Sequence, residues 1–201
     1  MNIPASDTAQ RTEHAPRRIV VLGDSCSGKS TLAERLARHL DAPYVELDAV
    51  HWQPNWTSLP DDQFRAHLDA IAEGERWVVA GNYRRIAEPT LWPHADLIVW
   101  LDLPLTLVLP RMVRRTWRRW RTHELLWGTN YEDPWQHFRL WETKKNLFSY
   151  RVTTSRARRA EFAALMDATQ RDGRRFVRLC SPREIEAFAS AFEASVEASS
   201  N

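Results

Sequence analysis

The chain lacks several features that would assign it to a specialised class of protein. It has only two cysteines, Cys26 and Cys180, which cannot build a disulfide framework and are typical of a reducing cytoplasm. It has no apolar run close to the length of a membrane-spanning helix, and its polar first sixteen residues do not form a secretory signal. It also has no internal repeat and no low-complexity block. We therefore expect a cytoplasmic globular protein with no membrane partner.

Lysine is scarce as well, which makes the position of each lysine informative. Arginine supplies 25 of the 28 basic residues and lysine only 3, while 26 acidic residues leave a net charge of +2. A balance this close to neutral favours no particular class of partner. The 201 residues suffice for one domain with a full-sized core. We expect a flexible leader over 1–16, a single domain over 17–193 and a flexible tail over 194–201.

The most informative stretch that the chain does contain is a glycine loop between a strand pattern and a helix pattern. Residues 23–30 read GDSCSGKS and fit the pattern G-x-x-x-x-G-K-[ST], in which glycines let the backbone wrap around phosphates. An apolar run over 19–22 precedes the loop, and leucines at every fourth position over 32–40 follow it. This context predicts a nucleoside triphosphate site, with Lys29 reaching the β- and γ-phosphates and Ser30 binding Mg²⁺ through its hydroxyl. The predicted nucleotide-binding residues are Gly23, Asp24, Ser25, Cys26, Ser27, Gly28, Lys29, Ser30 and Thr31.

Strand-like apolar runs alternate with helix-period stretches along the rest of the chain. This order predicts a three-layer α/β/α fold, in which helices cover both faces of a five-stranded parallel sheet. The glycine loop would then lie at the carboxyl edge of the sheet, and substrate-binding residues would follow the strand ends. The expected strands cover 18–22, 44–47, 77–80, 97–101 and 175–179, and the expected helices cover 30–40, 61–73, 105–121 and 182–192.

The end of the second expected strand places candidate chemistry at this edge. Asp48 can approach Mg²⁺ or orient the attacking hydroxyl of an acceptor, although an aspartate that merely caps a turn would show the same pattern. Trp52 and Trp56 are equally consistent with stacking on a substrate ring and with a place in the core.

The end of the third expected strand adds a second group of candidates. Gly81 permits a close approach to a ligand, and Asn82 follows it. Either Arg84 or Arg85 can clamp a phosphate or carboxylate, the alternative being a solvated basic turn. After the fourth strand, Asp102 stands where a magnesium-binding acid can lie, but its place two residues before Pro104 favours a turn. The predicted substrate-binding residues are Asp48, Trp52, Gly81, Asn82 and Arg84.

Six arginines within eleven residues form the second strong signal. Arg111, Arg115 and Arg118 fall on one helical face, where anionic phosphates would relieve the repulsion among like charges and stabilise a transferring phosphoryl group. Nucleic acid would relieve it too, since tryptophans interleave with the arginines, and a solvated helix face is the third alternative. A lid over about 111–159 would carry these residues. The cluster consists of Arg111, Arg114, Arg115, Arg118, Arg119 and Arg121, with Trp117 and Trp120 between them.

Five segments carry a family resemblance when they are taken together in order. They read GDSCSGKSTLAERLA, ELDAVHWQPNW, WVVAGNY, LIVWLDLP and PRMVRR. With them the chain resembles, from about residue 17 to residue 192, the adenylate kinase-like branch of the phosphate-loop kinases. It looks most similar to the small bacterial proteins called adenylate kinase-related or topology modulation proteins.

The resemblance implies roles for individual positions. Arg111 and Arg115 match the arginine pair at the start of the adenylate kinase lid. Gly81 and Arg84 match part of the D-G-F-P-R segment of those enzymes, in which the acid and the proline are replaced here. The monophosphate-binding segment expected after the second strand is missing, and Asp48 stands there as an aspartate does in shikimate and gluconate kinases.

These inferences lead to an enzyme that transfers a phosphoryl group from ATP with Mg²⁺ as cofactor. The acceptor is not determined by the sequence, and a monomer or a homodimer is expected. One alternative is a nucleic-acid-associated ATPase or a DNA-topology-modulating regulator, and another is a nucleotide-binding switch that transfers nothing. The expected catalytic residues are Lys29, Arg111, Arg115 and Asp48.

Overall fold

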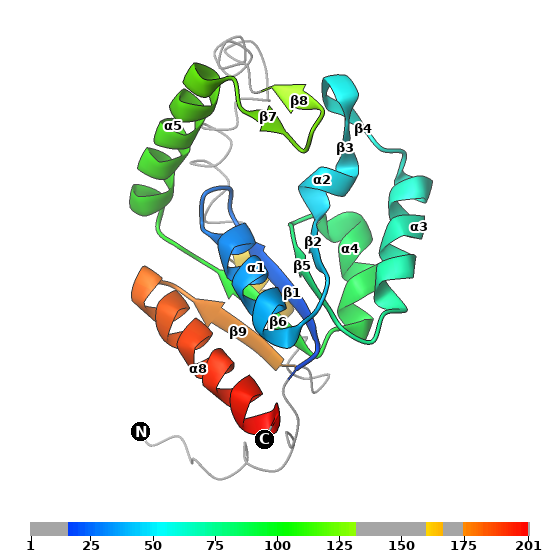
Figure 1. Cartoon of the computed structure of the whole chain (residues 1–201), viewed down its shortest axis with the longest axis vertical. Coiled ribbons are helices and arrows are strands. Elements are labelled where there is room, and N and C mark those ends of the chain that lie inside the picture. The colour runs from blue at the N-terminus through cyan, green and yellow to red at the C-terminus, as the bar shows by residue number, and fades with distance from the viewer. Residues whose placement is uncertain (1–15, 132–159, 167–174, 201) are drawn as a thin grey trace.

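A five-stranded parallel sheet forms the centre of the protein (Figure 1). The computed structural model describes residues 16–131, 160–166 and 175–200, so nearly all of the predicted leader and most of the predicted lid lie outside the described residues. Every neighbouring pair of strands in this sheet is parallel, which confirms the predicted fold class. In sheet order the strands are β2 (Tyr44–Glu46), β5 (Trp77–Ala80), β1 (Arg18–Gly23), β6 (Leu97–Leu101) and β9 (Arg175–Leu179).

Helices cover both faces of the sheet, and the central strands are therefore apolar on both sides. Val20 of β1 lies opposite Val79 of β5 and Ile98 of β6, and none of the three is more than 1% exposed. Continuous apolar runs are typical of strands without a solvent-facing side, which is why these strands were predictable from sequence. A hydrophobic cluster lies on each face of the sheet. On one face it includes residues of α3 (Asp61–Ala72) and α4 (Arg84–Leu91), and on the other face residues of α1 (Lys29–Leu40) and α8 (Pro182–Ser200) (Figure 1).

α1 leaves the glycine loop with the apolar spacing that the sequence predicts. Leu32, Leu36 and Leu40 recur every fourth residue and are at most 7% exposed, so this side of the helix packs on the sheet. The helix ends at Asp41, whose left-handed φ of 48° turns its N–H back to the Arg38 carbonyl at 3.3 Å.

The last helix, α8, is longer than the sequence analysis expects. It continues to Ser200, past the predicted end at 192, so the segment predicted as a tail over 194–201 is helical up to that residue. Val196 packs against the same core as α1. Alanine is the strongest helix former, and one packed side suffices to keep an alanine- and serine-rich stretch helical. Composition alone therefore ended this helix too early, and the flexibility of the segment over 194–201 remains a prediction.

Several short elements lie between the strands without a clear pattern in the sequence. α4 escapes prediction because Pro89 stands inside it, where a proline removes one helical N–H donor. Burial of Ile86, Ala87 and Leu91 against the sheet holds the helix nevertheless. The other unpredicted elements are α2 (Leu47–His51), β3 (Trp52–Gln53), η1 (Pro54–Trp56), β4 (Thr57–Ser58), η2 (Trp92–His94), β7 (Leu125–Leu126) and β8 (Asn130–Tyr131).

The arginine cluster lies on α5 (Leu105–Thr122), as the sequence predicts. The helix leads from the end of β6 to the small hairpin β7–β8 (Figure 1). Only Val108 and Met112 of its residues are buried. No helix within the described ranges is long and apolar enough to cross a membrane.

Candidate active site

The glycine loop connects β1 to α1 at the carboxyl edge of the sheet, where the sequence places it. The Ser27 N–H donates to the Asp24 carbonyl at 3.0 Å, which closes a turn inside the loop. Gly28 caps α1 with a left-handed φ of 95°, which glycine adopts without strain. A Cβ atom on Gly23 would lie 2.6 Å from Ser27 Oγ and 3.0 Å from Leu101 Cβ. Backbone conformation therefore requires the second glycine of the pattern, and close packing requires the first.

The loop and the first turn of α1 hold hydrogen-bond donors that no described residue satisfies. The N–H groups of Gly28, Lys29, Ser30 and Thr31 donate to no described atom, and no side chain caps the helix. Lys29 is 8% exposed and forms no hydrogen bond or ion pair with any residue in the described ranges. A shielded ammonium without a partner is unfavourable. Clustered N–H groups at a helix N-terminus next to such a cation fit the phosphates of a nucleotide.

Beside the loop, Ser30 and Glu46 form an oxygen pair. The Ser30 hydroxyl donates to Glu46 Oε1 at 2.9 Å, and the Trp127 indole Nε1–H donates to Glu46 Oε2 at 3.3 Å. A hydroxyl next to a carboxylate suits Mg²⁺, which prefers oxygen ligands and retains some of its waters. The sequence pattern favours Asp48 as the acid that approaches Mg²⁺ or the acceptor, and it does not single out Glu46. The available signal was its position as the last residue of the second strand.

Asp48 lies on α2 and faces the end of β5. Its Oδ1 accepts a hydrogen bond from the Tyr83 hydroxyl at 2.7 Å, and its Oδ2 receives none from any described residue. Burial and the negative charge of Asp48 raise the pKa of Tyr83, so the tyrosine remains a donor at neutral pH. Burial lowers the pKa of His51, whose ring centroid lies 4.5 Å from that of Tyr83, so the imidazole is neutral at pH 7. One carboxylate oxygen of Asp48 is thus fixed and the other remains able to accept a proton or a hydrogen bond.

A chain of aromatic rings runs beside Asp48 toward the hairpin β7–β8. The ring centroids are 5.2 Å apart for Phe64 and His51, 4.9 Å for His51 and Trp52, 5.7 Å for Trp52 and Trp56, and 5.8 Å for Trp56 and Trp127. Trp52 and Trp56 are half-buried, so neither belongs to the hydrophobic core. Stacking of these rings on a substrate remains a prediction.

Gly81 and Asn82 have partners inside the protein. A Cβ atom on Gly81 would lie 2.6 Å from Leu47 Cβ, so the close approach at this glycine is made by α2. Asn82 Oδ1 accepts the Gly23 N–H at 3.0 Å, and its Nδ2 donates to the Gly23 carbonyl at 2.6 Å. Asn82 therefore holds the first residue of the glycine loop against the end of β5, and contact of either residue with a substrate remains a prediction.

The two arginines after β5 are engaged in ion pairs. Arg84 pairs with Glu88 at 3.1 Å and with Glu161 at 2.9 Å, and Arg85 pairs with Asp61. Neither guanidinium is directed to the glycine loop by any recorded contact. Arg84 would have to release Glu88 and Glu161 before it could clamp a phosphate or carboxylate of a substrate, as the sequence predicts.

Asp102, the acid after β6, serves the fold. It is 8% exposed and accepts a hydrogen bond from Arg178 Nε at 3.0 Å. The Arg178 guanidinium lies 4.8 Å from the ring centroid of Trp100. These contacts agree with the structural alternative that the sequence analysis favours for Asp102.

Arg111 and Arg115 lie on α5 without contacts to the loop. Arg111 is exposed, whereas Arg115 is half-buried and its shielded Nε lacks a hydrogen-bond partner among the described residues. No described hydrogen bond or ion pair joins either arginine to the glycine loop. Their action on a transferring phosphoryl group remains a prediction.

The hairpin β7–β8 is docked on the segment that follows α2, a contact that the sequence does not reveal. Asn130 is 2% exposed, its Oδ1 accepts the Trp56 N–H at 2.8 Å, and its Nδ2 donates to the Gln53 carbonyl at 3.1 Å. The Trp56 Nε1–H donates to the Tyr131 carbonyl at 3.0 Å. These bonds place the hairpin so that Trp127 can reach Glu46.

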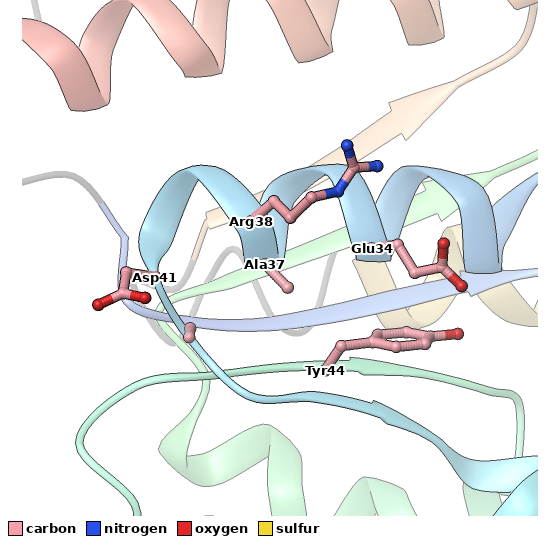
Figure 2. A pocket seen from close by; sticks show the side chains of 6 residues that line it. Glu34, Ala37, Arg38, Asp41 and Tyr44 are labelled. Atoms are coloured by element: carbon pink, nitrogen blue, oxygen red, sulfur yellow. The ribbon is translucent and has the colours of Figure 1, made fainter.

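A cavity of about 340 Å³ lies between α1 and β2, away from the glycine loop (Figure 2). Figure 2 shows Glu34 and Arg38 on the helix above Tyr44 of the strand, with Asp41 at the end of the helix. No residue of the glycine loop and neither Glu46 nor Asp48 lines it. The cavity is therefore separate from the candidate active site.

Solved structures of three kinases match this chain at low sequence identity. No protein-family model and no curated protein sequence matches the chain. Shikimate kinase from Acinetobacter baumannii in complex with shikimate is 14% identical, the match covers 90% of this chain and 93% of that chain, and the TM-score is 0.52. A sugar kinase from Janibacter sp. HTCC2649 is 17% identical over 91% of this chain and 97% of that chain, with a TM-score of 0.46. A gluconokinase from Sinorhizobium meliloti 1021 is 20% identical over 92% and 94%, with a TM-score of 0.43.

Identities this low show a shared fold and leave activity and substrate open. The chain therefore shares the fold of that shikimate kinase, and in this chain the fold is a five-stranded parallel sheet with helices on both faces.

Proposed function

We propose that the protein is an ATP-dependent kinase that phosphorylates a hydroxyl group of a small molecule. The observation that carries the proposal is the set of unsatisfied donors around Lys29, next to the Ser30–Glu46 pair. The loop amides and Lys29 would hold the β- and γ-phosphates, while Ser30 and Glu46 would hold Mg²⁺ directly or through water. When bound, Mg²⁺ would neutralise charge on the phosphate oxygens.

Asp48 is the group best placed to serve the acceptor. In the proposed reaction the acceptor oxygen bonds to the γ-phosphorus, the bond from that phosphorus to the β–γ bridging oxygen breaks, and ADP leaves. The hydroxyl proton passes to Asp48, whose Oδ1 is held by Tyr83 and whose Oδ2 has no described donor. Arg111 and Arg115 would stabilise charge on the transferring group once α5 approaches the loop.

The contacts of Arg84 favour a hydroxyl acceptor over a nucleoside monophosphate. The sequence predicts that Arg84 can clamp a phosphate or carboxylate of the substrate, but its guanidinium pairs with Glu88 and Glu161. Asp48 and Glu46 would also repel a second phosphate near the loop. The resemblance to topology modulation proteins specifies no phosphoryl acceptor, so it does not argue against a hydroxyl acceptor.

A screen of acceptors with labelled ATP and Mg²⁺ tests the proposed function. We expect label to pass to sugars, polyols or hydroxy acids and not to nucleoside monophosphates. On the acceptor found, Asp48→Asn should lower kcat by a factor of about 10² to 10⁴, because the asparagine amide cannot take up the proton. Asp62→Asn, an exposed acid on α3, serves as the matched control.

Three results would contradict the proposal. Transfer only to nucleoside monophosphates would favour the adenylate kinase alternative. An unchanged kcat in Asp48→Asn would remove the assigned base. Binding of ATP without transfer to any acceptor would favour a nucleotide-dependent switch.

Glu46→Gln should raise the Mg²⁺ concentration needed for half-maximal rate by about 10-fold to 100-fold. Glutamine can still accept the hydrogen bond from Ser30, but its amide nitrogen cannot accept the one from Trp127, so the change removes the charge and one hydrogen bond at nearly constant side-chain size. The measurement is the initial rate against Mg²⁺ concentration at fixed ATP, with the exposed Glu73→Gln as control. An unchanged Mg²⁺ dependence would show that Glu46 does not serve the metal.

A further inference from the structure

The outward side of α5 carries exposed tryptophans that the proposed reaction does not use. Trp117 is 61% exposed and Trp120 is 36% exposed, and their ring centroids lie 5.1 Å apart. Val113, 60% exposed, lies one turn before Trp117 on the same side of the helix. Most large apolar side chains of a soluble protein are shielded from water, so a row of this kind on one helix is unusual.

A row of arginines runs parallel to these apolar residues. Arg114, Arg118 and Arg121 each follow a member of the apolar row by one position, so the three recur at the same i, i+4, i+7 spacing. Arg114 and Arg121 form no ion pair with any described residue. Arg118 pairs with Glu124 at 3.2 Å, but its side chain is 64% exposed, and surface pairs of this kind contribute little.

The inward side of the same helix has a different composition. Val108 and Met112 are buried, and Arg115 is half-buried. Arg111 and Arg115, the arginines assigned to catalysis, adjoin this arginine row, since Arg111 lies three positions before Arg114 and seven before Arg118. Val113, Trp117 and Trp120 have no role in the proposed reaction, so the apolar row can serve a second partner.

We propose that the outward face of α5 binds single-stranded nucleic acid. The guanidinium row would contact successive phosphates, and Trp117 and Trp120 would stack on the unpaired bases beside them. From the first to the last arginine the helix rises about 10 Å, which is roughly the length of three stacked nucleotides. In a duplex the flat faces of the bases are covered by their neighbours, so the exposed indoles favour a single strand.

The pattern fits an anionic membrane less well. A helix that lies in a membrane surface has a wide apolar face opposite its basic face. In α5 the neighbouring apolar residues Val108 and Met112 are buried, so the exposed apolar residues form only a narrow row beside the arginines. The same arrangement places arginines that can contact phosphates directly beside rings that can stack on bases, and single-stranded nucleic acid requires both contacts.

Fluorescence anisotropy of a labelled oligothymidylate of about 20 nucleotides with the full chain tests the proposal. We expect binding at low salt that weakens steeply as salt rises. Trp117→Ala should weaken it by about tenfold or more, and Arg114→Ala should lower the slope of log Kd against log salt by about 0.7 to 1. Arg65→Ala, an exposed arginine on α3, is the matched control and should change neither quantity.

Further measurements distinguish oligonucleotide binding at this face from binding at the nucleotide site and from lipid binding. Lys29→Ala should bind the oligonucleotide as the unaltered protein does, and Trp117→Ala should keep phosphoryl transfer. Absence of oligonucleotide binding at low salt would overturn the proposal, as would equal affinity in Trp117→Ala. Binding to vesicles containing phosphatidylglycerol, with none to the oligonucleotide, would overturn it in favour of a lipid surface.

The exposure of the face can be measured directly. The tryptophan emission that disappears in Trp117→Phe should be quenched readily by acrylamide in the full chain. Emission that resists the quencher would show that this face is covered, and the proposal would then fail.

Discussion

Lys29→Ala is expected to lower kcat/KM for phosphoryl transfer by about a thousandfold while the fold is kept. Lys29 is 8% exposed and has no partner in the described part of the chain, so its ammonium is able to pair with a bound anion. Removing one positioned donor from a water-poor site costs roughly 10²-fold to 10³-fold in rate, and a full charge at the β–γ bridge should lie at the upper end.

Two measurements separate this loss of activity from a loss of structure. The urea midpoint of Lys29→Ala should equal or exceed that of the unaltered protein, because an unpaired shielded charge is removed. Lys29→Arg should recover little activity, since the planar guanidinium does not replace a compact ammonium. Arg38→Ala, an exposed position on the same helix, is the control for α1. Undiminished turnover in Lys29→Ala would remove the proposed site altogether.

Gly81→Ala is expected to destabilise the protein by about 3 kcal/mol, which is the largest effect on stability that we predict. The new Cβ would lie 2.6 Å from Leu47 Cβ, an atom that no rotamer change can move away, and φ at this position is +155°. Either β5 or α2 must therefore shift. Because Asn82 binds Gly23 from the next position, the displacement should also reach the glycine loop and reduce activity.

A second glycine separates the steric part of this effect from backbone strain. Gly128 has a φ of +75° and nothing within 4 Å of its ideal Cβ position. Gly128→Ala should therefore cost only about 1 kcal/mol, from the left-handed conformation alone. Urea denaturation followed by circular dichroism gives both values. Equal stabilities for Gly81→Ala and the unaltered protein would show that α2 does not pack on β5 as described.

The fold could be predicted because its signals are local. Each central strand is a continuous apolar run, and α1 and α3 show helical spacing of their buried residues. Errors occurred where local signals are weak or misleading. Pro89 obscured α4, and the alanine- and serine-rich end of α8 suggested a tail.

The site could be predicted only in part for the same reason. Lys29 and Ser30 belong to one contiguous pattern whose spacing reflects the geometry of a bound phosphate chain. Glu46, Trp127 and Asn130 have no such pattern, because their importance depends on partners far away in sequence. The same distance explains why Gly81 was expected to approach a ligand when it approaches Leu47.

The amino-acid order by itself determined the parallel sheet, the glycine loop and the presence of an arginine-rich helix. Hydrophobic periodicity and loop stereochemistry act between residues that are neighbours in the chain, so they can be recognised without coordinates. Only the tertiary structure decided which carboxylate meets Ser30, which arginines are occupied by ion pairs, and which side of α5 faces solvent. Those outcomes depend on contacts across the sheet and between its loops, where the packing of all the elements together sets each distance.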